Sequence, residues 1–135
     1  MSTGTIVPHI TAVYAALSAI LVMILALRVV AMRRAARVGL GDGGNAALAQ
    51  RIRVHGNAIE NLPLALLLLL LLELTGAPVL LLHGFGALLL GARVLHAWGL
   101  STRPGGSFGR FSGTLVTWLL VLAMAGWLIV GRLLG

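Results

Sequence analysis

Residues 51–74 read RIRVHGNAIENLPLALLLLLLLEL. The second half is almost pure leucine, and such a run belongs in a protein core or in a bilayer. The first half places two arginines, a histidine, two asparagines and a glutamate at the start of the same predicted helix. Because charged groups in or near a membrane span are costly, their presence here indicates a functional site.

The polar side chains of this helix form two stripes, at about 100° per residue. Arg53, Asn57 and Glu60 (i, i+4, i+7) form one stripe, and Arg51 and His55 form another on nearly the opposite side. Two opposed stripes predict two neighbours, a helix of the same chain and one from another subunit. The plainer alternative is a solvated helix end with Arg and His among the headgroups and one buried Arg–Glu pair.

The composition is that of a polytopic membrane protein. Of the 135 residues, 59% are hydrophobic and 10% are charged, and a soluble domain of this size has too little interior to bury so much apolar surface. Four apolar runs are long enough to cross a hydrocarbon core about 30 Å thick. We therefore predict an all-α membrane protein, a single four-helix bundle over 1–135 with spans at about 6–32, 54–74, 79–100 and 110–134.

The net charge of +7 comes from arginine alone, since the chain has no Lys. These arginines stand at the ends of apolar spans, where positive-inside topology and anionic headgroups account for most of them. We therefore expect no nucleic-acid partner. The absence of Cys excludes disulfides, thiolate metal sites and a cysteine nucleophile, so any thiol chemistry needs a thiol brought by a ligand. We expect no metal.

Charge also predicts the topology. The loop after the first span is the one richest in Arg, which places it in the cytoplasm. The short uncharged turn at 75–78 suits the other side, and the loop at 101–109 with Arg103 returns to the cytoplasm. A bacterial inner membrane protein with both termini extracytoplasmic follows. Arg28 lies about one turn deeper than the loop arginines, which favours a role inside the bundle.

The third and fourth predicted helices add polar groups at the same membrane face. Arg93, His96 and Leu100 share one helical face, and Arg110 stands in the first turn of the last helix. The helix dipole disfavours a cation there, so Arg110 is easier to understand with an anion bound beside it. Three glycines of the third helix (Gly84, Gly86 and Gly91) permit close helix approach.

Taken together, these residues resemble a known family, the membrane-associated proteins in eicosanoid and glutathione metabolism (MAPEG). The family signature is Arg, two residues on His or Gln, two on Asn, three on Glu, then Pro. The sequence has Arg53-Val-His55-Gly-Asn57-Ala-Ile-Glu60-Asn61-Leu-Pro63. The resemblance extends to Gly44-Asn45 before this helix, to Gly91-Ala-Arg93-Val-Leu-His96, and to an Arg opening the last helix.

The resemblance implies a homotrimer of four-helix subunits that binds glutathione between adjacent subunits near the cytoplasmic face. By position, Arg110 faces the glutathione sulfur and is the catalytic residue. The remaining implied glutathione ligands are Arg28, Arg51, Arg53, His55, Asn57, Glu60, Arg93 and His96.

The chemistry of these residues agrees with that implication. Glutathione carries two carboxylates and one ammonium, which suit several arginines and one glutamate such as Glu60. A guanidinium beside the thiol lowers its pKa from roughly 8.5–9 toward neutral. The resemblance then implies that the thiolate attacks a lipophilic electrophile from the surrounding lipid or reduces a hydroperoxide, as in a glutathione transferase or peroxidase.

One departure from the family leaves an alternative open. Many members have a tyrosine one turn after the position of His96, where this chain has Leu100, and its only tyrosine is Tyr14. If the missing hydroxyl normally donates to the sulfur, activity rests on Arg110, helped by His96. The alternative is a non-catalytic membrane protein that binds glutathione or a lipid headgroup. A small multidrug-type transporter fits less well, because Glu60 lies beside Arg53 near one face and not alone at mid-depth.

Overall fold

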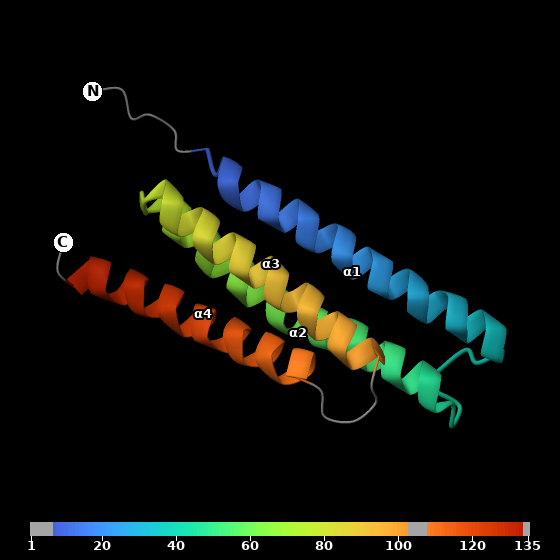
Figure 1. The fold of residues 1–135 in the computed structure, drawn as a ribbon. Coiled ribbons are helices and arrows are strands. Elements are labelled where there is room, and N and C mark those ends of the chain that lie inside the picture. Colours follow the sequence, from blue (N-terminus) through green and yellow to red (C-terminus); the bar gives the residue numbers. More distant parts are fainter. Residues whose placement is uncertain (1–6, 103–107, 134–135) are drawn as a thin grey trace.

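The structure is a computed structural model that describes residues 7–102 and 108–133. Its four helices are α1 (His9–Ala36), α2 (Ala46–Leu74), α3 (Val79–Thr102) and α4 (Phe108–Leu133) (Figure 1). Each is long and apolar enough to cross a membrane, so the predicted all-α fold of four membrane-spanning helices is confirmed. The charge of Arg103 was used to predict that the loop at 101–109 is cytoplasmic, and this residue lies outside the described residues.

Consecutive helices run antiparallel, and α2 and α3 form the centre of the bundle (Figure 1). Within the described ranges, α1 packs on α2 and α3, and α4 packs on the same two helices, while α1 and α4 do not meet. The polar residues of α2 and α3 therefore have neighbouring helices on two sides, whereas α1 and α4 each keep a broad outward face.

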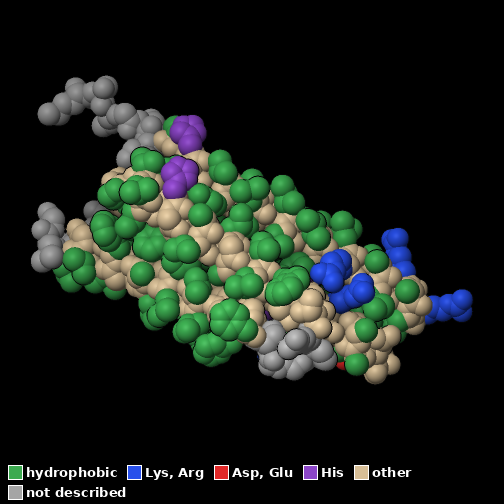
Figure 2. Space-filling view, in the orientation of Figure 1, with side chains coloured by type: hydrophobic (Ala, Val, Ile, Leu, Met, Phe, Trp, Pro, Cys, Tyr) green, Lys and Arg blue, Asp and Glu red, His purple; other side chains and the backbone are tan. Residues whose placement is uncertain are grey.

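Arginine gathers at one end of the bundle. Figure 2 shows Arg side chains where α1 ends and α2 begins, and His side chains at the opposite end of the face in view. We call the first of these the Arg-rich end, defined by Arg33, Arg34, Arg37 and Arg51. The α2 helix has 29 residues and is therefore about 43 Å long, more than the roughly 30 Å hydrocarbon core. The polar first turns of α2, at the Arg-rich end, are the part of the helix suited to the headgroup region.

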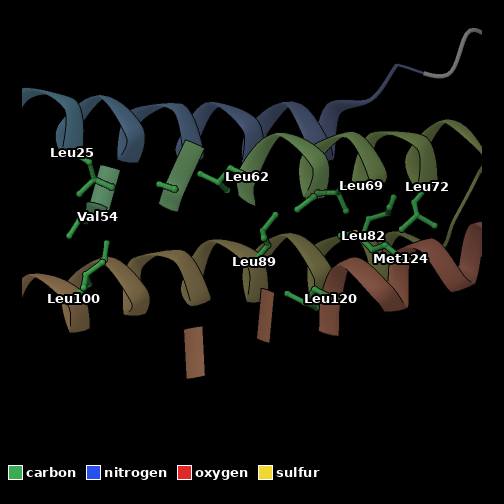
Figure 3. Packing of buried hydrophobic residues seen from close by; sticks show 13 residues of the cluster. Leu25, Val54, Leu62, Leu69, Leu72, Leu82, Leu89, Leu100, Leu120 and Met124 are labelled. Atoms are coloured by element: carbon green, nitrogen blue, oxygen red, sulfur yellow. The ribbon is translucent and has the colours of Figure 1, made fainter. Parts of the chain in front are cut away.

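Residues of α2 and α3, chiefly leucines, form most of the core. Leu62, Leu69 and Leu72 of α2 point toward Leu82 and Leu89 of α3 (Figure 3). The other faces of the leucine run are open, as the 54% exposure of Leu64 and the 51% exposure of Leu67 show. One face of the leucine run thus packs inside the bundle, and the other face is free to contact lipid or another subunit.

Glycine brings α3 and α4 into close contact at the Arg-rich end. A Cβ at Gly113 would lie 2.5 Å from the carbonyl oxygen of Ala92, and one at Gly99 would lie 2.7 Å from the backbone nitrogen of Arg110. Backbone therefore meets backbone here, where even an alanine would force the helices apart. This contact sets the start of α4 directly beside α3.

The glycines expected to permit close approach behave differently from one another. Gly86 is covered by the ring of Tyr14 from α1, so no side chain fits there. Gly84 and Gly91 have nothing within 4 Å of where a Cβ would be. Of these three glycines, only Gly86 allows another helix of the same chain to pack closely against α3.

Glu73 caps α1 from the end of α2. Its side chain is 7% exposed, and its carboxylate accepts hydrogen bonds from the backbone N–H of Ile10 (2.8 Å) and of Thr11 (2.6 Å). The first N–H groups of a helix have no partner within the helix. A residue from another helix therefore satisfies the start of α1 and fixes it against α2.

Candidate functional site

Two adjoining cavities lie between α2, α3 and α4 toward the Arg-rich end. Their volumes are about 300 Å³ and about 470 Å³, and Asn57, His96 and Arg110 line both of them. The smaller cavity is otherwise lined by Ala46, Ala49, Gln50 and Arg53 of α2 and by Leu100 of α3. The larger one is lined in addition by Phe111, Thr114, Leu115 and Trp118 of α4. We call the smaller cavity, which Gln50 and Arg53 also line, the polar compartment, and the larger one the apolar compartment. The two meet at the side chains of Asn57, His96 and Arg110.

Arg93 supports this meeting point from behind. It is 2% exposed and lines neither cavity among the described residues. Its Nη1 donates to Oδ1 of Asn57 (2.7 Å) and its Nη2 to the carbonyl of Gly113 (3.1 Å). Its Nε has no hydrogen-bond partner within the described part of the chain. One guanidinium thus ties α3 to α2 and α4 and fixes the orientation of Asn57.

His96 and Leu100 lie on the same buried face of α3 as Leu89 and Arg93. His96 is 3% exposed and stands where the two cavities meet, because it lines both. Leu100 closes the polar compartment one turn further on. The backbone carbonyl of Leu100 accepts a hydrogen bond from the side-chain nitrogen of Gln50 in α2.

Arg53 and Glu60 form an ion pair at the outer edge of the polar compartment. Arg53 Nη1 lies 3.6 Å from Glu60 Oε1, and the two side chains are 66% and 55% exposed. An ion pair with this much solvent contact contributes about 1 kcal/mol or less to folding. Within one chain, both groups are therefore available to a ligand.

Two further predicted site residues, Arg28 and Arg51, lie on the other side of α2 from the cavities. Arg51 Nη1 donates to the backbone carbonyl of Arg28 (3.3 Å), and Arg28 Nη1 donates to Ser101 Oγ of α3 (3.3 Å). His55 lines neither cavity. A single chain therefore divides the predicted residues into a cavity group (Arg53, Asn57, His96 and Arg110, with Arg93 and Glu60 in contact with it) and an α1-side group (Arg28 and Arg51), and His55 is assigned to neither.

Two polar residues of the site were not assigned from the sequence. Gln50 lines the polar compartment, and its spacing of three and seven residues from Arg53 and Asn57 continues their stripe and could have revealed it. Asn61 donates to the backbone carbonyl of Asn57 (2.8 Å) and accepts from Trp118 Nε1 (3.3 Å). This second contact joins α2 to α4, and no spacing in the sequence reports it.

The described residues contain no group of three His, Cys, Asp or Glu side chains placed to hold a metal ion. The donors around the cavities are guanidinium, amide and imidazole groups. This set suits an anionic organic ligand with hydrogen-bond acceptors.

Comparison with known proteins identifies the family. The model of the MAPEG family matches residues 11–130, a range that includes the residues of both groups. The inner membrane protein YecN of Escherichia coli K12 is 41% identical over 115 residues, which cover 85% of this chain and 86% of YecN. YecN of Escherichia coli O6:H1 matches to the same extent. The chain therefore belongs to the MAPEG family.

Proposed function

We propose that the protein is a glutathione-dependent transferase or peroxidase of the inner membrane that acts as a homotrimer. The observation that carries the proposal is the junction of a polar and an apolar compartment at Asn57, His96 and Arg110. A conjugating enzyme needs this arrangement, because its thiol substrate is charged and its second substrate is lipophilic. MAPEG membership supports the choice of glutathione.

Glutathione fits the charges of the polar compartment. Arg53 can pair with one carboxylate, and Glu60, released from an exposed ion pair, can accept the ammonium. The Oδ1 of Asn57 is held by Arg93, so its amide N–H groups face outward as donors. The wall of the polar compartment then offers a cationic donor, Arg53, to the glycine carboxylate of glutathione and a neutral donor, Asn57, to its peptide carbonyls.

The α1-side group supports an assembly in which a neighbouring subunit completes the site. Arg28 and Arg51 lie across α2 from the cavity, so they cannot serve the same ligand as Arg53 within one chain. If the α1 side of one subunit meets the α4 side of the next, both groups contact one glutathione. A head-to-tail contact of this kind closes into a ring, and the proposed ring is a trimer. The open space beside Gly84 and Gly91 offers further surface for such contacts.

Arg110 is proposed to activate the thiol. It lies in the first turn of α4, close against α3 at Gly99, and lines both compartments. A guanidinium together with the positive end of a helix stabilises a thiolate. The thiolate displaces a leaving group from an electrophile in the apolar compartment. Alternatively, it attacks a hydroperoxide, and a second glutathione completes the reduction to alcohol, water and glutathione disulfide.

The proposed orientation follows the positive-inside rule. The Arg-rich end lies in the cytoplasm, where glutathione is available, and both termini are extracytoplasmic. The name of the YecN relatives supports an inner-membrane location.

A second function, binding without catalysis, is favoured by Leu100. This side chain is 7% exposed and closes the polar compartment at the place where many relatives in the family carry a tyrosine. An aliphatic chain cannot donate a hydrogen bond to sulfur. Under this alternative the compartment holds glutathione or a lipid headgroup as a binding site only.

Calorimetric titration of the detergent-purified protein with glutathione, followed by two activity assays, tests both functions. The assays are conjugation of 1-chloro-2,4-dinitrobenzene and reduction of cumene hydroperoxide. We expect saturable binding and turnover of at least one substrate. Binding without turnover of either would leave the second function, and absence of glutathione binding would contradict the enzyme proposal altogether.

A further inference from the structure

A separate basic hollow lies at the end of α1. Four of its lining residues, Val30, Arg33, Arg34 and Arg37, are spaced i, i+3, i+4 and i+7 and share one face of the helix. Val38 and Gly39, just after the helix, complete a hollow of about 370 Å³. We call it the α1 hollow. None of its lining residues belongs to the cavity group or to the α1-side group.

The turn after α1 gives the hollow its shape. Arg37 has φ 54°, in the left-handed region, and ends the helix. The N–H of Val38 then donates back to the carbonyl of Arg33 (3.0 Å), which brings Val38 against the end of the helix. Arg33 itself is held, because its Nη1 donates to the carbonyl of Gly41 (2.6 Å). Arg34 and Arg37 remain exposed at the rim.

No carboxylate of the described chain neutralises these three guanidiniums. The ion pair found in residues 7–102 and 108–133 is that of Arg53 and Glu60. The nearest acid in sequence, Asp42, accepts the backbone N–H of Gly44 (2.9 Å) in its own turn. Three cations on one helix face can therefore pair with an anion from outside the chain.

The position of the hollow decides what kind of anion fits. The apolar run of α1 ends at Met32, so the arginines begin where hydrocarbon gives way to headgroups. Below them, Leu27 and Val30 are 61% and 41% exposed and continue the hollow as an apolar surface. Arg28 lies on the opposite face of the helix and points to Ser101 of α3, so the hollow faces away from the bundle.

We propose that the α1 hollow is a binding site for an anionic glycerophospholipid of the surrounding leaflet. Its phosphodiester contacts Arg34 and Arg37, whose planar guanidiniums can each bind phosphate bidentately. One acyl chain lies along Val30 and Leu27. An inorganic phosphate would use the cationic half of the hollow and leave the apolar half unused, which is why we assign the site to a lipid.

Lipid titration of the purified full-length protein, followed by native mass spectrometry, tests this site. Phosphatidylglycerol is the probe, phosphatidylcholine the neutral comparison, and inorganic phosphate the headgroup-only comparison. We expect one saturable phosphatidylglycerol per chain, weaker phosphatidylcholine binding and no competition by equimolar phosphate. Equal binding of both lipids, or full displacement by phosphate, would overturn the proposal.

Two double variants locate the binding. Arg34→Gln/Arg37→Gln should weaken phosphatidylglycerol binding about tenfold or more. Arg28→Gln/Arg51→Gln removes the same charge at the same end of the bundle but away from the hollow, on the opposite face of α1 and on α2, and should leave that binding within about twofold. Equal losses in both variants would mean general attraction to the membrane and would overturn the site. So would an unchanged affinity in the first variant.

A third variant covers failure of the first to insert into the membrane. Arg34→Lys/Arg37→Lys keeps the charges that set the topology but loses the bidentate geometry. A several-fold loss of phosphatidylglycerol affinity in this variant supports the site, and unchanged affinity contradicts it.

Discussion

Arg93 is the residue whose environment says most about the site. A guanidinium that is 2% exposed is stable only when its hydrogen-bonding capacity is well used, and here two of its nitrogens hold Asn57 and Gly113. The remaining Nε has no partner among the described atoms. We therefore interpret Arg93 as the residue that positions Asn57, and we propose that it acts on glutathione through that amide.

This interpretation predicts strong coupling between Arg93 and Asn57. Arg93→Lys keeps the charge but cannot hold both partners, so glutathione affinity should fall about tenfold or more, comparable with loss of one good polar contact. Asn57→Ala should cause a similar loss. In a double-mutant cycle the two losses should not add, because each change removes the same arrangement. Additive losses in calorimetric titrations would show that Arg93 binds the ligand independently.

Arg110 should affect the chemistry of the bound thiol more than the binding of glutathione. Arg110→Ala should leave glutathione affinity within a few fold and raise the pKa of the bound thiol, at about 1.4 kcal/mol of lost thiolate stabilisation per pKa unit. Since a higher thiol pKa means less thiolate at neutral pH, the activity profile should shift to higher pH. Ultraviolet thiolate absorbance, titrated against pH, measures the shift directly.

Arg53→Ala is the matched control for that experiment. Arg53 lines only the polar compartment, so its loss should weaken glutathione binding while moving the thiol pKa less than Arg110→Ala does. A wild-type protein without thiolate at neutral pH would remove the transferase proposal and leave the binding alternative suggested by Leu100.

At the scale of helices, the α1–α2 contact depends on Glu73 in a way that can be measured. Glu73→Ala leaves the N–H groups of Ile10 and Thr11 without their acceptors, which should cost about 1–2 kcal/mol of stability. Thermal unfolding in detergent should show a lower midpoint. Glu73→Gln retains one acceptor oxygen at the same place and should lose less. An unchanged midpoint in Glu73→Ala would mean that water replaces the cap.

Sequence patterns predicted the helices better than the contacts between them. Hydrophobic length and helical periodicity are local signals, so α2 could be predicted, together with the polar stripe that contains Arg53 and Asn57. The cap that Glu73 provides joins residues more than sixty positions apart, and no periodicity reports such a pair. The same holds for Gly113, whose small size matters because the backbone of Ala92 lies beside it.

At the scale of the whole molecule, the division of the predicted ligands is the feature that a single chain leaves unexplained. The cavity group and the α1-side group lie on opposite sides of α2, although the family resemblance assigns both to glutathione. Exposed apolar residues cover much of the bundle, including Leu67 of α2 and Trp118 of α4. Both lipid and neighbouring subunits can cover these faces, and the proposed trimer assigns part of them to subunit contacts.

Mixed oligomers can show whether two subunits build one site. One variant, Arg28→Ala/Arg51→Ala, lacks the α1-side group, and the other, Arg53→Ala/Arg110→Ala, lacks part of the cavity group. Each should bind glutathione poorly alone. In a randomly mixed ring with equal amounts, about a quarter of the sites combine the intact group of one variant with the intact group of the other. Binding capacity at near wild-type affinity should return to about that fraction, with native mass spectrometry reporting three chains per particle. If each site belonged to one subunit, every site would lack one group, and mixing would restore nothing.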